Sequence, residues 1–116
     1  MVSIRHFAER RLRGHVARVR LPARFARLPI YLSAGNHVAV LKPGDAKFEA
    51  YLLDFVDRFV PKGGVAWDIG ANMGMFAVPA ATRARLVLGF EPDPFNLRLL
   101  QRTKEANPGL PGHVRQ

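Results

Sequence analysis

The pattern of apolar residues changes character near residue 64 of this 116-residue chain. After that point, two short apolar runs, residues 65–69 and 85–90, alternate with two segments of helical spacing, 73–82 and 94–106. The order strand, helix, strand, helix predicts parallel pairing of the two strands and an α/β fold. Residues 65–69 are almost entirely apolar, which is typical of a parallel strand covered on both faces.

Residues 29–63 are predicted to form a hairpin followed by a helix. Two short strands, at 30–32 and 37–41, flank a turn that contains a Gly-Asn pair. The helix is predicted over residues 46–60, where apolar positions recur on one stripe, and Asp45 is placed to cap it. This segment precedes the alternating strands and helices as a separate structural part.

The N-terminal arm, residues 1–28, spaces its apolar residues at steps of three or four and is predicted to be helical. It holds eight arginines against one acid, Glu9, and so carries +7 of the net charge of +9. One interpretation is contact with nucleic acid or with an anionic membrane surface. We favour a peripheral helix with a solvated charged face. A transit peptide, which is also rich in arginine, is a third option.

The stretch VAWDIGANMGMF places two glycines directly after the strand predicted at 65–69. Ligands of open α/β sheets bind at such strand ends. Gly70 can take backbone angles closed to other residues, and Gly74 lets the next helix start close to the strand. Asn72 can cap that helix and leave the amides of its first turn as an anion site. Asp68 ends the strand, where its carboxylate can receive a cationic amine.

Glu91 ends the second predicted strand, 21 residues after Gly70. An acid at this distance is placed to accept hydrogen bonds from the hydroxyls of a ribose. A dinucleotide also needs the pattern G-x-G-x-x-G, but Asn72 and Met75 stand at its second and third glycine positions. A ligand with a ribose and no pyrophosphate fits better, and S-adenosylmethionine is such a ligand. An NAD-dependent oxidoreductase fragment is the alternative that this departure disfavours.

Two linked motifs, DIGANMGMF and GFEPDPFNLRLL, resemble those of the FkbM-type family of S-adenosylmethionine-dependent methyltransferases. That family ends one strand in D-I-G-A-N-x-G and the next in F-E-P-x-P, followed by an asparagine and a leucine-rich helix. The resemblance spans about residues 64–107. The positions that meet the pattern are Asp68, Ile69, Gly70, Ala71, Asn72, Gly74, Phe90, Glu91, Pro92, Pro94 and Asn96.

The resemblance implies methyl transfer to a hydroxyl of a small molecule or a carbohydrate, with S-adenosyl-L-methionine as cofactor. It implies a partial Rossmann-like methyltransferase fold, in which a hairpin and a helix precede a β-α-β-α unit in residues 64–116. Because the family's sheet has more strands than the two predicted here, we expect a fold truncated before the remaining strands. The strand at 65–69 then has an open edge, and this chain alone has little or no activity. The implied cofactor-binding residues are Asp68, Gly70, Ala71, Asn72, Gly74 and Glu91.

Other classes of site are not expected from the sequence. The chain has no cysteine, and none of its four histidines has metal-ligand spacing, so no metal site is predicted. The catalytic residues are unknown, because no candidate for a general base is identified. Trp67 and Phe76 are interpreted as core residues, and Pro79 inside a predicted helix has no functional account. No apolar run reaches the ~20 residues of a membrane span, and a cytoplasmic location is expected.

Overall fold

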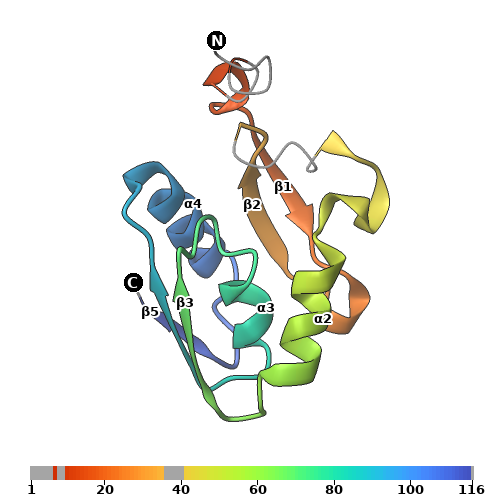
Figure 1. Cartoon of the computed structure of the whole chain (residues 1–116), viewed down its shortest axis with the longest axis vertical. Helices are drawn as coiled ribbons and strands as arrows, with labels where there is room; N and C mark the ends of the chain where they lie inside the picture. Colours follow the sequence, from red (N-terminus) through yellow and green to blue (C-terminus); the bar gives the residue numbers. More distant parts are fainter. Residues whose placement is uncertain (1–6, 8–9, 36–40, 116) are drawn as a thin grey trace.

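The two strands predicted after residue 64 belong to a parallel sheet with the order β3–β4–β5 (Figure 1). The computed structural model describes residues 7, 10–35 and 41–115. Strand β3 (Val65–Ile69) pairs with β4 (Leu86–Phe90), and β4 pairs with β5 (His113–Arg115). The α/β fold and the parallel pairing of the first two strands are therefore confirmed. The sequence pattern misses β5, because only the middle residue of its three is buried and no apolar run marks it.

Helix α4 (Pro94–Glu105) follows β4 almost as predicted. Asp93 is its N-cap, and the Asp93 side chain accepts a hydrogen bond of 2.9 Å from the amide of Phe95. A proline in the first helical position has a backbone angle suited to a helix start and lacks an amide that would go unpaired there. These two local signals explain why the start of α4 can be read from the sequence.

Helix α3 (Ala77–Ala81) is much shorter than the segment 73–82 predicted for it. The residues before Ala77 form an extended turn after β3 and not helical turns. Pro79 therefore lies in the first turn of α3, where an amide has no partner within the helix. This position accounts for a proline that would be costly in the middle of a longer helix.

The face of the three-stranded sheet that points away from the helices is apolar, and the described residues leave it uncovered. We call it the bare face; its residues on β3 and β4 are Val65, Trp67, Ile69, Leu86, Leu88 and Phe90. Trp67 is 67% exposed and Ile69 is 80% exposed. The expectation of a strand covered on both faces is thus wrong for this part of the chain, and so is the interpretation of Trp67 as core. An apolar pattern on both sides predicts two faces suited to burial, but only one of them meets helices here.

The N-terminal region contains a hairpin and not one long helix. Strand β1 (Val16–Arg20) pairs antiparallel with β2 (Pro29–Ser33). Between residues 10 and 35, helical structure is limited to residues 10–12 and to a 3-10 turn, η1 (Ala23–Phe25), which lies between the two strands. The helix predicted over residues 1–28 is therefore wrong for β1, where β-branched valines and exposed arginines suit an edge strand. The predicted strand at 30–32 is confirmed within β2, but its partner is β1. The partner predicted at 37–41 lies largely outside the described residues.

Helix α2 (Ala50–Phe59) follows a short 3-10 turn, η3 (Gly44–Lys47). Asp45 lies within η3 and does not cap α2, whose N-cap residue is Glu49. The helix therefore begins four residues later than the predicted 46–60. Among the described residues, none of the helices combines the length and the apolar character that a bilayer crossing needs.

Buried polar contacts join the hairpin to α4. The Asn107 side-chain amide donates to the carbonyl oxygens of Pro29 and Thr103, each at 2.8 Å. The amide of Tyr31 donates to the Thr103 hydroxyl oxygen at 3.0 Å. Because buried polar groups stabilise a fold only when they are paired, these contacts fix the position of the hairpin against the helix. The hairpin, α2 and the helix side of the sheet share one core.

Candidate cofactor site

The turn after β3 has the backbone shape predicted from its first glycine. Gly70 has a φ of +84°, which most residues with a side chain avoid. The amides of Gly70 and Ala71 donate to the carbonyl oxygen of Phe90 at 2.8 and 3.0 Å and so anchor the turn to the end of β4. Asn72 has a φ of +52° and does not cap a helix, because α3 begins only at Ala77. The predicted anion site in a first helical turn is therefore not formed at Asn72.

Gly74 serves packing within this turn. Its φ is +97°, and a Cβ at this position would lie 2.6 Å from Cδ1 of Leu100 and 3.0 Å from Cγ2 of Val78. These distances are shorter than van der Waals contact, so α4 approaches the turn only because Gly74 has no side chain. Gly74 thus shapes the turn from behind and does not line a cavity beside it.

A cavity of about 200 Å³ lies where β3 passes into the turn. We call it the turn hollow. It brings together four of the predicted cofactor residues, with side chains from the start of α2 and from the far end of the turn. Its lining residues are Glu49, Leu52, Asp68, Gly70, Ala71, Asn72, Met73, Met75 and Phe76.

Two buried oxygen atoms of the turn hollow lack a hydrogen-bond partner among the described residues. They are Oδ2 of Asp68 and Oδ1 of Asn72. Burial raises the pKa of the Asp68 carboxyl; an amide hydrogen bond from Ala77 acts in the opposite direction, and the charge of Glu91 adds a smaller increase. Two acceptors with no internal donor are suited to a ligand that donates hydrogen bonds, and a cationic amine does so most strongly beside a carboxylate.

Glu91 supports the turn from the side of β4. Its Oε2 accepts a hydrogen bond of 2.8 Å from the amide of Asn72, and its Oε1 accepts one of 2.8 Å from the amide of Asp93. The carboxylate therefore joins the turn to the N-terminus of α4, and Glu91 does not line the turn hollow. A carboxylate has about four acceptor positions, so two remain for donors of a ligand.

Sequence reasoning did not assign five of the residues that line the turn hollow to the site: Glu49, Leu52, Met73, Met75 and Phe76. Glu49 precedes α2, and its carboxylate accepts a hydrogen bond of 2.8 Å from the Tyr51 hydroxyl. Phe76 is partly buried and packs on the core, as expected for a core residue. The two residues of the α2 region are far from the turn in sequence, and no local pattern indicates their approach.

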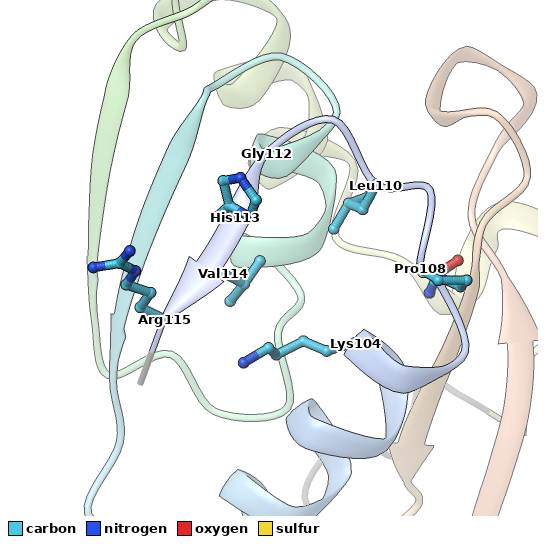
Figure 2. Close-up of a pocket in the computed structure, with 8 residues that line it drawn as sticks. Lys104, Pro108, Leu110, Gly112, His113, Val114 and Arg115 are labelled. Carbon is cyan, nitrogen blue, oxygen red and sulfur yellow. The ribbon is translucent and has the colours of Figure 1, made fainter.

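A second hollow, of about 340 Å³, lies between the end of α4 and β5 (Figure 2). Lys104, His113 and Arg115 contribute to its lining. Figure 2 shows the Lys104 side chain beside Val114, whereas the His113 and Arg115 side chains lie on the other side of the strand. Alternation along β5 thus separates the cations, and they do not converge on one point where an anion would bind.

No group of three or more histidine, aspartate or glutamate residues in the described part of the chain is arranged to hold a metal ion.

Two comparisons with known proteins bear on the identity of the chain. The sequence matches no protein-family model and is similar to no curated protein. The geometry of the turn hollow is therefore the basis for assigning a function.

Proposed function

We propose that the turn hollow binds S-adenosyl-L-methionine and that the chain carries the cofactor-binding part of an FkbM-type methyltransferase. The proposed acceptor is a hydroxyl group of a small molecule or a carbohydrate. When bound, the cofactor supplies a methyl group from its sulfonium to the acceptor oxygen. The residues of this chain bind and orient the cofactor.

The observation that carries the proposal is the pair of buried, unpartnered oxygens of Asp68 and Asn72 beside the glycine turn. The amino-acid end of the cofactor has an ammonium group, which can donate to both oxygens. Gly70 and Ala71 present backbone without bulky side chains at the same wall, so a ligand can approach closely. Glu91, at the end of β4 and bonded to the Asn72 amide, keeps acceptor capacity for ribose hydroxyls.

Isothermal titration with S-adenosylmethionine and S-adenosylhomocysteine tests the site. Both ligands carry the ammonium group, so Asp68→Asn is expected to weaken both by about tenfold or more, since hydrogen bonds to charged groups contribute about 1.5–3 kcal/mol. Asp45→Asn is the matched control, because it removes an exposed acid from η3 outside the hollow. Its affinity for both ligands is expected to equal that of the wild type.

Two outcomes count against the proposal. The assigned site is wrong if binding persists in both Gly70→Val and Glu91→Ala, with folding of each variant verified by circular dichroism. Saturable binding of NAD at the same site, abolished by Asp68→Asn, would instead favour the oxidoreductase alternative.

Within the described part of the arginine-rich arm, no comparable observation supports a contact with nucleic acid or with a membrane surface. Arg13 pairs with Asp93 at the start of α4, and Arg24 pairs with Asp54 and Asp57 on α2. These arginines are thus engaged within the molecule. A polyanion contact would show as an affinity that falls steeply with salt and is lost on deletion of residues 1–27.

A further inference from the structure

Glu49 brings a second carboxylate to the turn hollow, and the function proposed above gives it no role. The residue is half-buried and stands at the N-cap of α2. An N-cap side chain commonly accepts a hydrogen bond from an amide of the first helical turn, but the Glu49 side chain makes no such bond. Capping of α2 therefore does not account for an acid at this position.

Neighbouring side chains hold the Glu49 carboxylate at the hollow. Its Oε2 accepts a hydrogen bond of 2.8 Å from the hydroxyl of Tyr51, which is an exposed residue of α2. A carboxylate has about four acceptor positions, which is more than one hydroxyl fills. The helix itself is fixed against the turn by Phe55, whose ring centroid lies 6.2 Å from that of Phe76. The carboxylate is thus in place at the hollow without a ligand.

The polar lining of the turn hollow is acidic. Two of its polar side chains, Glu49 and Asp68, are carboxylates, and the third, Asn72, has a buried amide oxygen without a partner among the described residues. None of the described residues that line the hollow is a lysine, an arginine or a histidine. A cavity lined by charges of one sign concentrates ligands of the opposite sign. The lining therefore suits an ammonium group and offers no cationic side chain to a carboxylate.

We propose that Glu49 binds the ammonium group of the ligand together with Asp68, so that the hollow recognises an amine and does not require the neighbouring carboxylate of an amino acid. This inference rests on the proposed function, because it takes the ligand to be an adenosyl compound. An ammonium group has three donors, and the two carboxylates and the Asn72 amide oxygen supply an acceptor for each. Hydrogen bonds between charged groups are shorter and stronger than those between neutral ones. The ligand class is adenosyl compounds with a primary amine.

Three adenosyl thioethers separate the contributions of the amine and the carboxylate. Methylthioadenosine has neither group, decarboxylated S-adenosylhomocysteine has the amine alone, and S-adenosylhomocysteine has both. Isothermal titration of the wild type is expected to show that the decarboxylated compound binds about tenfold or more tightly than methylthioadenosine, since it alone of these two has the charged donor. It is also expected to bind at least as tightly as S-adenosylhomocysteine, because no cationic side chain of the lining favours the carboxylate.

Glu49→Gln keeps the size of the side chain and removes its charge. It is expected to weaken both amines about fivefold or more and to leave methylthioadenosine unchanged. An acid at a helix N-terminus also stabilises the helix, but loss of that effect would change all three affinities alike. Tyr51→Phe removes the hydroxyl that positions the carboxylate and is expected to weaken only the amines, by a smaller factor. Glu105→Gln is the matched control, because it removes the same charge at the end of α4, outside the hollow.

Three outcomes would overturn the inference while the proposed function stands, provided that Asp68→Asn still weakens S-adenosylhomocysteine. They are unchanged binding of the amines by Glu49→Gln, equal weakening of all three compounds by this variant, and weaker binding of the decarboxylated compound than of S-adenosylhomocysteine. Circular dichroism verifies that each variant is folded. If S-adenosylhomocysteine does not bind the wild type, the proposed function fails and this inference fails with it.

Discussion

The two glycines of the turn after β3 form a matched pair for measuring how tightly α4 packs on this turn. Both have a positive φ, +84° at Gly70 and +97° at Gly74. Their surroundings differ: a Cβ at Gly70 meets no atom within 4 Å, whereas one at Gly74 meets Cδ1 of Leu100 at 2.6 Å. Alanine at the two positions therefore introduces the same type of backbone strain, but only one variant introduces a clash.

The size of each effect follows from these two terms. An alanine in the left-handed region costs about 1–2 kcal/mol, which is the full expected cost of Gly70→Ala. Gly74→Ala adds overpacking of about 1–3 kcal/mol, because Leu100 is fully buried and has no space to move into. The total of roughly 2–5 kcal/mol is a large fraction of a typical stability of about 5–15 kcal/mol.

Urea denaturation followed by circular dichroism gives both free energies of unfolding, and thermal melts give a second measure. At about 4 °C per kcal/mol, the Tm of Gly74→Ala is expected to lie roughly 4–12 °C below that of Gly70→Ala. Equal losses in the two variants would refute the reasoning, because they would show that the side chain of Leu100 does not pack against the turn.

Two further predictions concern buried polar groups. Burial raises the folded-state pKa of Asp68, so its contribution to stability is complete below about pH 4 and is lost as the pH rises through the folded-state pKa. Asp68→Asn is therefore expected to be more stable than the wild type at pH 7 and to lose this advantage below pH 4. Urea titrations at several pH values measure the free energy of unfolding of both proteins. A wild type more stable than Asp68→Asn at pH 7 would contradict the prediction. Asn107→Ala removes two buried hydrogen bonds, to Pro29 and Thr103, and is expected to cost about 1–3 kcal/mol of unfolding free energy. Gln101→Ala, on the exposed side of α4, is the control and is expected to change the same quantity by less than about 0.5 kcal/mol.

The elements after residue 64 could be predicted because their signals are local. The apolar run of β3 is confirmed at its predicted bounds, and an N-cap aspartate followed by proline marks the start of α4. The N-terminal region was predicted less well. The segment VARVR of β1 has apolar residues at spacings compatible with both a helix and a strand, and its pairing with β2 decides between them.

The candidate site shows the same limit. Local sequence placed Asp68, Gly70 and Asn72 beside one another, and the structure places all three on the turn hollow. It did not indicate that Glu49 approaches from α2, because that contact depends on how the helix packs. Nor did it indicate that Glu91 accepts a hydrogen bond from the Asn72 amide, since such a contact depends on the exact path of the backbone.

The contact between Met73 and the hairpin has a consequence for oxidation chemistry. The Met73 sulfur is fully buried and accepts a hydrogen bond of 3.0 Å from the amide of Ser33 in β2. Peroxide converts such a thioether to a polar sulfoxide, but it reaches this sulfur only when the turn and the hairpin separate. The rate at which Met73 gains an oxygen atom, followed by mass spectrometry, therefore reports how often the turn that shapes the hollow parts from the hairpin.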